Sequence, residues 1–366
     1  MDASSNGARH PGGRDGKPGF VGAPRGGGKS RGNQAQGRAP LAHAPCYGAL
    51  DLGTNNCRLL LARPTERGFV IVDAFSRIVR LGEGLGTSGR LKDVAMERTI
   101  EALRVCSNKL KWHNVERFRL VATEACRLAE NGPDFIDRVN TEVGIELEII
   151  NRETEAMLAA AGAEALIGED AVSAIVFDIG GGSTEVMWVA RKADGGEVKA
   201  WISLAAGVVT LSERHGGGRD VTENDFNAMR GDVEVLLRPF VDEVKQLNGD
   251  APGPDHLLGT SGTVTTIAGV HLGLRHYDRS MVDGCWLDGE DATRVTNQLR
   301  NMNYEERTRN GCIGRERADL VLAGCAILEE IRAAFPGLRI RVADRGLREG
   351  ILAHLMKADG HLGRRV

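Results

Sequence analysis

The sequence has no arrangement of cysteines or histidines typical of a zinc site or a disulfide framework. Its seven cysteines are an odd number, are scattered, and never form a C-x-x-C pair. The nine histidines show no H-x-x-x-H spacing, and no G-x-S-x-G elbow occurs. These absences argue against zinc, di-iron and the common acyl-transfer chemistries. Unpaired cysteines indicate reduced thiols, so we expect a cytoplasmic protein.

Long apolar runs are also missing, since no stretch approaches the roughly 18 residues that span a bilayer. A formal net charge of −3 gives no overall attraction to nucleic acid or to a membrane, and we expect neither as a partner. The 42% hydrophobic and 27% charged content is ordinary for a globular protein. At 366 residues the chain exceeds the usual limit of about 250 to 300 for one core, so two domains are expected.

Residues 1–45 have almost no large apolar side chains. They contain eleven glycines, five prolines and a local charge of +5, because seven Lys and Arg residues oppose only Asp2 and Asp15. We expect a disordered basic tail. The stretch APRGGGKS at 23–30 matches a loose phosphate-loop pattern, but no strand precedes it and no helix follows, so we reject it. The tail also lacks the apolar region of a secretory signal.

The stretch VFDIGGGSTEV at 176–186 combines a buried strand with a glycine loop. The apolar run closes on Asp178, passes through three glycines and two hydroxyl residues, and reopens after Glu185. A tight hairpin turn would explain the glycines alone. However, the many backbone N–H groups of such a loop form a concave site that suits an anion.

The chain contains a second copy of this pattern at 47–62, YGALDLGTNNCRLLLA. Asp51 aligns with Asp178 and Gly53 with Gly180, and a further strand follows each copy, at 69–74 and at 197–202. Two such loops can face each other across a cleft and bind a polyphosphate from both sides. Their acids would hold a divalent cation, directly or through water.

The rest of the chain alternates strands with helices. A helix is predicted at 92–112, strands are predicted to end near Ala122 and to span 145–150, and a helix is predicted after Asn151. A strand and helix at 257–270 carry a third turn of small residues, which is either an ordinary loop or a site for an anion or ribose. This alternation predicts an α/β fold, with parallel strands covered by helices and an antiparallel edge from the hairpins.

Transfer of a phosphoryl group to water needs an anion cradle, a cation and a group that orients the water. The loops supply the cradle, and Glu185, seven residues beyond Asp178, can support the metal or the loop. Glu155 or Glu153, at the start of one helix, can orient the water, and spacing does not choose between them. Arg127, just past a strand end, can bind phosphate with its guanidinium.

Six ordered motifs resemble one family. DLGTNNCRLLLA, ATEACRLAENGPDFIDRV, INRETEAMLAAAG, VFDIGGGSTEV, LGTSGTVTTIAG and RADLVLAG with DRGLREGIL occur in the order and spacing of the exopolyphosphatase / guanosine pentaphosphate phosphohydrolase family (Ppx/GppA). The chain is similar to the short two-domain form of this family, which belongs to the sugar kinase, Hsp70 and actin superfamily. The resemblance implies two duplicated ribonuclease H-like domains with a cleft between them, at 46–158 and 159–366, with the last helix packing back on the first domain.

The resemblance also implies roles for individual residues. Glu155, rather than Glu153, would be the catalytic carboxylate, and Mg²⁺ (or Mn²⁺) would be the cofactor. The metal ligands would be Asp51, Asp178 and Glu185. The phosphate-binding residues would be Gly53, Thr54, Asn55, Arg127, Gly180, Gly181, Gly182 and Ser183. A homodimer is implied as well. Arg58 departs from the small or aromatic residue often found at its position in the family.

The expected function is an exopolyphosphatase that acts on inorganic polyphosphate. Its alternatives are a guanosine pentaphosphate (pppGpp) 5′-phosphohydrolase, a kinase of the same superfamily, and a non-catalytic sensor of polyphosphate or alarmone. A water-orienting glutamate argues against the kinase and the sensor. Two domains around a cleft should close on their ligand, with hinges near 155–165 and near 345.

Overall fold

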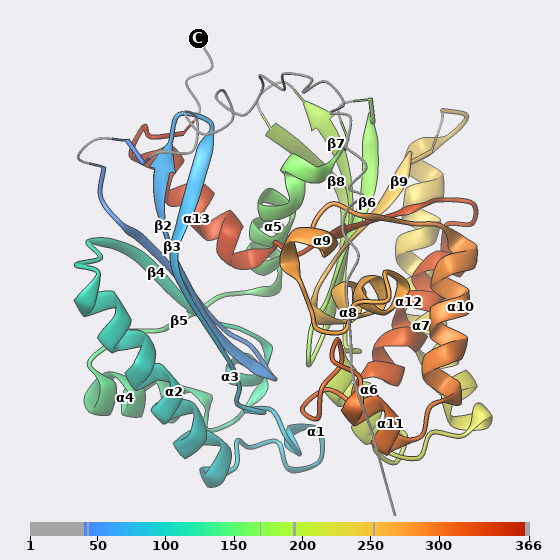
Figure 1. Ribbon diagram of the computed structural model, residues 1–366, viewed down its shortest axis with the longest axis horizontal. Helices are drawn as coiled ribbons and strands as arrows, with labels where there is room; N and C mark the ends of the chain where they lie inside the picture. Colours follow the sequence, from blue (N-terminus) through green and yellow to red (C-terminus); the bar gives the residue numbers. More distant parts are fainter. Residues whose placement is uncertain (1–39, 42–43, 169, 193–194, 252, 363–366) are drawn as a thin grey trace, which may run out of the picture.

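The computed structural model describes residues 40–41, 44–168, 170–192, 195–251 and 253–362. The rejected phosphate loop at 23–30, and most of the expected tail at 1–45, lie outside the described residues. The described chain forms two α/β halves side by side, each built around one sheet (Figure 1). None of the described helices is long and apolar enough to cross a membrane.

The first sheet starts as an antiparallel meander and continues with parallel strands, in the order β3-β2-β1-β4-β5. Its strands are β1 (Tyr47–Leu52), β2 (Asn56–Thr65), β3 (Gly68–Ile78), β4 (Arg117–Ala122) and β5 (Glu148–Ile149). The predicted strand at 145–150 shrinks to the two residues of β5. This strand is exposed at the sheet edge and pairs only with the end of β4.

The second sheet repeats this plan, in the order β10-β11-β9-β6-β7-β8. Its strands are β6 (Ser173–Ile179), β7 (Thr184–Lys192), β8 (Gly195–Leu204), β9 (His256–Thr260), β10 (Trp286–Leu287) and β11 (Ile340–Ala343). β6 pairs antiparallel with β7 and parallel with β9, as β1 does with β2 and β4. The predicted duplicated α/β fold is therefore confirmed.

Helices cover both sheets. Those of the first half are α1 (Leu85–Ser88), α2 (Asp93–Trp112), α3 (Glu124–Leu128), α4 (Gly132–Val143) and α5 (Arg152–Ala163), followed by the 3₁₀ turn η2 (Glu164–Leu166). Those of the second half are α6 (Val208–Arg214), α7 (Glu223–Asn248), α8 (Gly262–His271), α9 (Arg279–Val282), α10 (Gly289–Asn301), α11 (Tyr304–Arg309), α12 (Val321–Ala334) and α13 (Leu347–Ala358).

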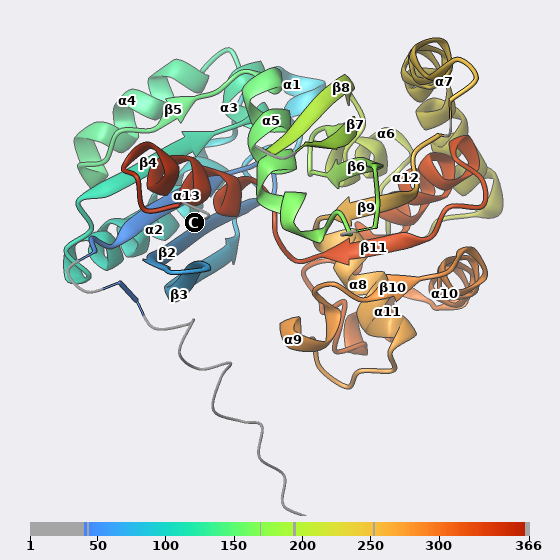
Figure 2. The same cartoon turned by 90° about the horizontal axis from the view of Figure 1, so that it is seen from above.

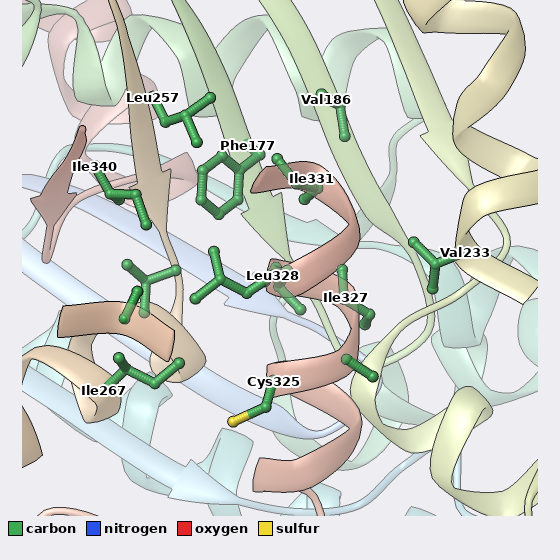
Figure 3. Packing of buried hydrophobic residues seen from close by; sticks show 14 of the residues in the cluster. Phe177, Val186, Val233, Leu257, Ile267, Cys325, Ile327, Leu328, Ile331 and Ile340 are labelled. Atoms are coloured by element: carbon green, nitrogen blue, oxygen red, sulfur yellow. The ribbon is translucent and has the colours of Figure 1, made fainter. Parts of the chain in front are cut away.

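The largest core lies between the second sheet and helices α7, α8 and α12. β6 is buried along nearly its whole length, which explains its continuous apolar run. Figure 3 shows Phe177 of β6 facing Leu328 and Ile331 of α12. Because this face is sealed by large apolar side chains, polar residues of the strands are functional candidates only at the strand ends, where loops begin.

The last helix of each half covers the sheet of the other half. Ala156, Ala160 and Ala163 of α5 pack on β6, β7 and β9 of the second sheet. Ile351 and Leu352 of α13 pack on β1, β2 and β4 of the first sheet. Figure 2 shows α13 lying over the first sheet, with α5 between the two halves.

Helices α5 and α13 cross at two glycines with no side chains between their backbones. A Cβ atom at Gly162 would lie 2.0 Å from the carbonyl oxygen of Gly346, and one at Gly350 would lie 1.9 Å from the carbonyl oxygen of Leu158. Neither position can hold a larger residue without a backbone shift. This crossing lies within the segments where hinges are expected, although the hinge motion itself stays a prediction.

Candidate active site

The two glycine-containing loops form the same turn. The N–H of Gly53 donates to the carbonyl oxygen of Asn56, and the N–H of Gly180 donates to that of Ser183, each at 2.9 Å. In both cases the bond joins residues three apart at the start of a hairpin. The duplication seen in the sequence therefore extends to individual hydrogen bonds.

The strands flanking these loops also share one register. Asp51 on β1 lies opposite Arg58 on β2, and Asp178 on β6 lies opposite Glu185 on β7. The two aspartates are therefore structurally equivalent, as the sequence alignment predicts. Their cross-strand partners carry opposite charges, so the two halves do not contribute equally to the chemistry of the cleft.

The carbonyl groups of the second loop are directed toward helix α6. The carbonyl oxygens of Gly180 and Gly181 accept from the N–H groups of Val208 and Val209, at 2.9 and 2.8 Å. Within the described residues, no protein acceptor is found for the N–H groups of residues 181–183. A run of N–H groups left without acceptors in this way forms an anion-binding nest.

The first loop is oriented in the same manner. The carbonyl oxygen of Thr54 accepts from Gly82, and that of Asn55 accepts from Val79 and Arg80, at 2.9 to 3.0 Å. The N–H groups of Thr54 and Asn55 have no acceptor in the described part of the chain. Each half thus provides one loop whose N–H groups are available to an anion.

The two loops touch across the cleft, and glycine makes this contact feasible. A Cβ at Gly182 would lie 2.7 Å from Oγ1 of Thr54, and one at Gly181 would lie 3.1 Å from the backbone nitrogen of Asn55. Any side chain at these positions would push the loops apart. The close approach explains why the second loop contains consecutive glycines.

A pocket of about 110 Å³ lies between the two loops, with room for several water molecules or a small anionic group. It brings together every predicted site residue except one. Its lining includes Asp51, Gly53, Thr54, Asn55, Glu155, Asp178, Gly180, Gly181, Gly182, Ser183 and Glu185. The exception, Arg127, lies behind Glu155 and touches it.

Glu155 reaches the pocket from the first turn of α5. Asn151 caps this helix, because its side chain accepts from the N–H of Thr154 at 2.8 Å. Nη2 of Arg127 donates to Oε2 of Glu155 at 3.0 Å. Burial, and then repulsion from Glu185, raise the pKa of Glu155 well above its usual value, and Arg127 opposes this rise. By contrast, Glu153 is exposed and does not line the pocket.

Three further acids lie deep in the same pocket. Burial raises the pKa of both Asp51 and Asp178, and the charge of nearby Arg58 limits the rise in each case. Oε1 of Glu185 accepts from the hydroxyls of Ser183 and Ser203 at 2.8 and 2.9 Å. Burial and repulsion from Asp178 nevertheless raise the pKa of Glu185 to about 7.

The donor chemistry of these acids fits a hard divalent cation such as Mg²⁺. Asp51, Asp178 and Glu185 offer only oxygen, and their raised pKa values show that a positive charge would relieve their burial and mutual repulsion. No group of three acids, histidines or cysteines among the described residues is close enough to hold an ion alone. The fit is therefore to an ion held by one or two carboxylates, with substrate oxygens and water completing its coordination.

Several polar side chains around the pocket have no partner within the protein. The Oδ1 atoms of Asn55 and Asn56 and the Oγ of Ser261 are buried without a hydrogen bond. Ser261, just before α8, also adopts a φ of 107°, which is unusual for a residue other than glycine. Buried polar groups of this kind indicate a ligand or ordered water. The third small-residue turn therefore contributes to the pocket wall.

Three arginines lie in the pocket or near its acids, and sequence reasoning assigned a role to none of them. Arg58 and Arg317 line the pocket, and the Arg317 guanidinium lies against Gly262 at the start of α8. Arg348 lies close enough to Asp51 to lower its pKa. The duplication could have revealed Arg58, because it follows Asp51 by the same seven residues that separate Glu185 from Asp178. Nothing local marks the other two, which come from distant segments.

Comparison with known proteins places this site in context. The model of the Ppx/GppA phosphatase family matches residues 60–359. A crystal structure of the Aquifex aeolicus member of that family is similar over 87% of this chain and 99% of its own, with 29% identity and a TM-score of 0.71. An exopolyphosphatase-like protein matches with the same coverage and identity and a TM-score of 0.78. An exopolyphosphatase from Cytophaga hutchinsonii covers 86% of this chain and 98% of its own, at 26% identity and a TM-score of 0.77.

Proposed function

This chain belongs to the Ppx/GppA phosphatase family, and we propose that it is an exopolyphosphatase, which hydrolyses the terminal phosphoanhydride bond of inorganic polyphosphate and releases orthophosphate. The observation that carries the proposal is the position of Glu155. This carboxylate lies in one pocket with two loops whose amide N–H groups have no acceptor among the described residues. The exopolyphosphatase name of the Cytophaga structure supports the choice of a polymeric substrate.

The end of the polyphosphate chain would bind between the two loops. The N–H groups of Thr54 and Asn55 would contact it from one side and those of residues 181–183 from the other. Arg58 and Arg317 would neutralise oxygens that the loops do not reach. Such preorganised donors stabilise negative charge on the phosphoryl group as it transfers.

Glu155 would act as the general base toward an attacking water. The water oxygen forms a bond to the terminal phosphorus, and the bond from that phosphorus to the bridging oxygen breaks. The water proton passes to Glu155, whose raised pKa makes it a stronger base than an ordinary glutamate. The bridging oxygen keeps the electron pair and becomes the new end of a chain shortened by one phosphate.

Mg²⁺ is the cofactor that the acids would accept, with Mn²⁺ as the alternative. Asp51 and Asp178, with Glu185 behind them, would hold it at the base of the pocket. When bound, it supplies positive charge that neutralises the phosphate oxygens. The two serine hydroxyls that donate to Glu185 keep its carboxylate oriented toward the pocket.

A second candidate substrate is pppGpp, hydrolysed at its 5′ end by the same chemistry. One wall of the pocket favours a nucleotide, because it is apolar and a linear polyphosphate has no apolar group to contact it. This wall is formed by Val208, Leu320 and Val321. The turn at Ser261 and Gly262, with its unpartnered serine oxygen, lies in the same lining and suits a ribose hydroxyl. Hydrolysis of a nucleotide end and of a polymer end requires the same base and loops.

Phosphate release by the purified protein with Mg²⁺ tests the proposal. Long-chain polyphosphate and pppGpp are assayed in parallel, with Glu155→Gln and Glu153→Gln beside the wild type. We expect release from polyphosphate at the higher rate, a loss of about a hundredfold or more in Glu155→Gln, and wild-type rates in Glu153→Gln. Glu153 is the matched control, because it lies on the same helical turn but outside the pocket.

Other results would redirect the assignment. Faster release from pppGpp would assign the nucleotide as the substrate. Tight binding of either compound without release under Mg²⁺ or Mn²⁺ would instead identify a sensor. Equal loss in both glutamate variants would remove Glu155 as the base and leave it as an ordinary residue of the first helical turn.

A further inference from the structure

Glu124, to which neither the sequence motifs nor the proposed mechanism assigns a role, lies in the wall of the pocket. It is the first residue of α3, and only 3% of its surface is exposed. A Cβ at Gly182 would lie 3.0 Å from Cγ of Glu124, so this side chain packs against the glycine loop of the other half. A carboxylate buried to this degree requires compensating charge.

Two arginines supply that charge. Oε2 of Glu124 accepts from Nε and Nη2 of Arg127, at 3.0 and 2.5 Å, and Oε1 accepts from Nη2 of Arg152 at 2.6 Å. Burial alone would raise the pKa of Glu124, but the hydrogen bonds from Arg152 and Arg127 outweigh it, and the pKa lies below its usual value. Glu124 is therefore a charged carboxylate that binds two guanidinium groups.

Arg127 is shared between Glu124 and the proposed base. Its Nη2 atom donates both to Glu124 and to Oε2 of Glu155, while its Nη1 donates to the carbonyl oxygen of Ile150. Guanidinium groups favour bidentate pairing with a carboxylate. Without Glu124, the Nε and Nη2 donors of Arg127 would have Glu155 as their nearest remaining carboxylate partner.

We propose that Glu124 is a positioning residue, which binds the Nε and Nη2 donors of Arg127 and thereby keeps a lone pair of the Glu155 carboxylate free for the proton of the attacking water. The inference rests on the proposed hydrolase function. It assigns to Glu124 no contact with substrate. Its effect is on the orientation of Arg127, and through it on the base.

Arg152 gives Glu124 a second effect, on substrate binding. The charge of Arg152 interacts with Glu185 and Glu155 as well as with Glu124, so this guanidinium lies near the site but is occupied by Glu124. Removing the carboxylate would free the Arg152 guanidinium for an incoming polyanion. Loss of Glu124 should therefore slow the chemical step without weakening the binding of substrate.

The test separates turnover from binding in Glu124→Gln. We expect kcat to fall about ten- to a hundredfold, KM to stay constant or fall, and the dissociation constant for short polyphosphate in EDTA to fall severalfold. Glu124→Asp keeps the charge on a shorter side chain and should recover part of the lost kcat. Glu148→Gln is the matched control, because it removes a comparable carboxylate from Arg119 outside the pocket, and it should behave as the wild type.

A double-variant cycle checks that Glu124 acts through Arg127. Arg127→Ala will itself lower activity, and adding Glu124→Gln to it should lower kcat no further. A kcat of Glu124→Gln equal to that of the wild type would overturn the proposal. So would a raised KM at unchanged kcat, or fully additive losses in the double variant.

Two readouts guard against ambiguous results. If Glu124→Gln fails to fold, as judged by its thermal unfolding, the comparison of kcat and KM moves to Glu124→Asp, where an unchanged kcat contradicts the proposal. If the wild type releases no phosphate at all, the proposed function fails. In that case the binding experiment still decides, because weaker polyphosphate binding by Glu124→Gln would contradict the release of Arg152.

Discussion

Arg58 and Glu185 occupy the same position in the two halves of the chain, each opposite the aspartate next to the end of the first strand of its meander. One half therefore presents a cation to the pocket where the other presents an acid. A phosphate chain and a divalent cation have opposite charges and need different partners. Because Arg58 and Glu185 differ in charge, the two equivalent halves give the pocket one basic side and one acidic side.

Replacement of Arg58 should weaken substrate binding more than it slows the reaction. Arg58→Gln removes a guanidinium that lines the pocket, and a hydrogen bond to a charged group contributes about 1.5 to 3 kcal/mol, so we expect KM for polyphosphate to rise about ten- to a hundredfold. Steady-state kinetics measures this. Arg63→Gln on the same strand is the control, because Arg63 donates to the carbonyl oxygen of Ala44 outside the pocket. An unchanged KM would place Arg58 outside the binding surface.

The apparent pKa on the acid side of the pH–rate profile should lie above the usual pKa range of a glutamate. Glu155 must be ionised to accept a proton, and burial and the charge of Glu185 raise its pKa. We therefore expect kcat/KM to rise with pH through an apparent pKa clearly above about 4.3. Rates from pH 4 to 9, with Glu153→Gln as the control, give this value. A flat profile down to pH 4 would contradict the assignment.

Without metal, the ionisation of Glu185 should destabilise the fold. Its folded pKa is about 7, above the unfolded value of about 4.3. The folded state therefore binds this proton more tightly, and the free energy of unfolding falls as the pH rises through this window. Relative to Glu185→Gln, the wild type should lose on the order of 3 kcal/mol between pH 4 and pH 8. Denaturant unfolding in EDTA measures this.

Two comparisons make the Glu185 prediction specific. Added Mg²⁺ should restore the free energy of unfolding that the wild type loses at high pH, because the ion neutralises the buried carboxylate. It should have no such effect on Glu185→Gln. Glu116→Gln replaces an exposed glutamate and should follow the wild type at every pH. If the unfolding free energies of the wild type and Glu185→Gln changed by the same amount across the pH range, ionisation of this carboxylate would not destabilise the fold in the absence of metal.

A methyl group at Gly182 should separate the two glycine-containing loops. The added Cβ of Gly182→Ala would lie 2.7 Å from Oγ1 of Thr54, which forces one loop to move. We expect kcat/KM to fall more than about tenfold, because displacement of catalytic groups by an ångström is costly. Gly231→Ala, at an open position on α7, is the control and should keep full activity. Wild-type kinetics in Gly182→Ala would mean that the loops need not touch.

The glycine crossing of α5 and α13 should be sensitive to the smallest side chain. In Gly350→Ala, the new Cβ would lie 1.9 Å from the carbonyl oxygen of Leu158, so we expect a loss of more than about 2 kcal/mol in unfolding free energy. Substrate-induced closure, measured by small-angle scattering, should also be impaired if this crossing is the hinge. His354→Ala changes an exposed side chain of the same helix and should affect neither.

The duplication of the fold could be predicted because the same local sequence pattern occurs in both halves. Apolar strands ending in an aspartate and small residues at 47–62 and 176–186 identify both meanders, and the structure confirms them. The same patterns marked both loops. The resemblance to one family, rather than local spacing, favoured Glu155 over Glu153, and in the structure only Glu155 lines the pocket.

Residues that reach the site from distant segments could not be predicted in this way. Arg317 follows an irregular segment after α11, and Arg348 lies on the last helix, so only the folded chain brings them near Asp51 and Asp178. One partner of Glu124 is hidden for the same reason, because Arg152 lies 28 residues away in the sequence. Charge pairs formed through tertiary contacts leave no periodic signal.

The exchange of helices between the halves constrains how this chain can be made. Synthesis proceeds from the amino end, so the first sheet is complete on the ribosome long before α13 emerges to cover β1, β2 and β4. Until then, an apolar face of that sheet has no covering within the nascent chain. The first half therefore cannot reach its final state before α13 has been made, and the docking of α13 on the first sheet is a late step of folding.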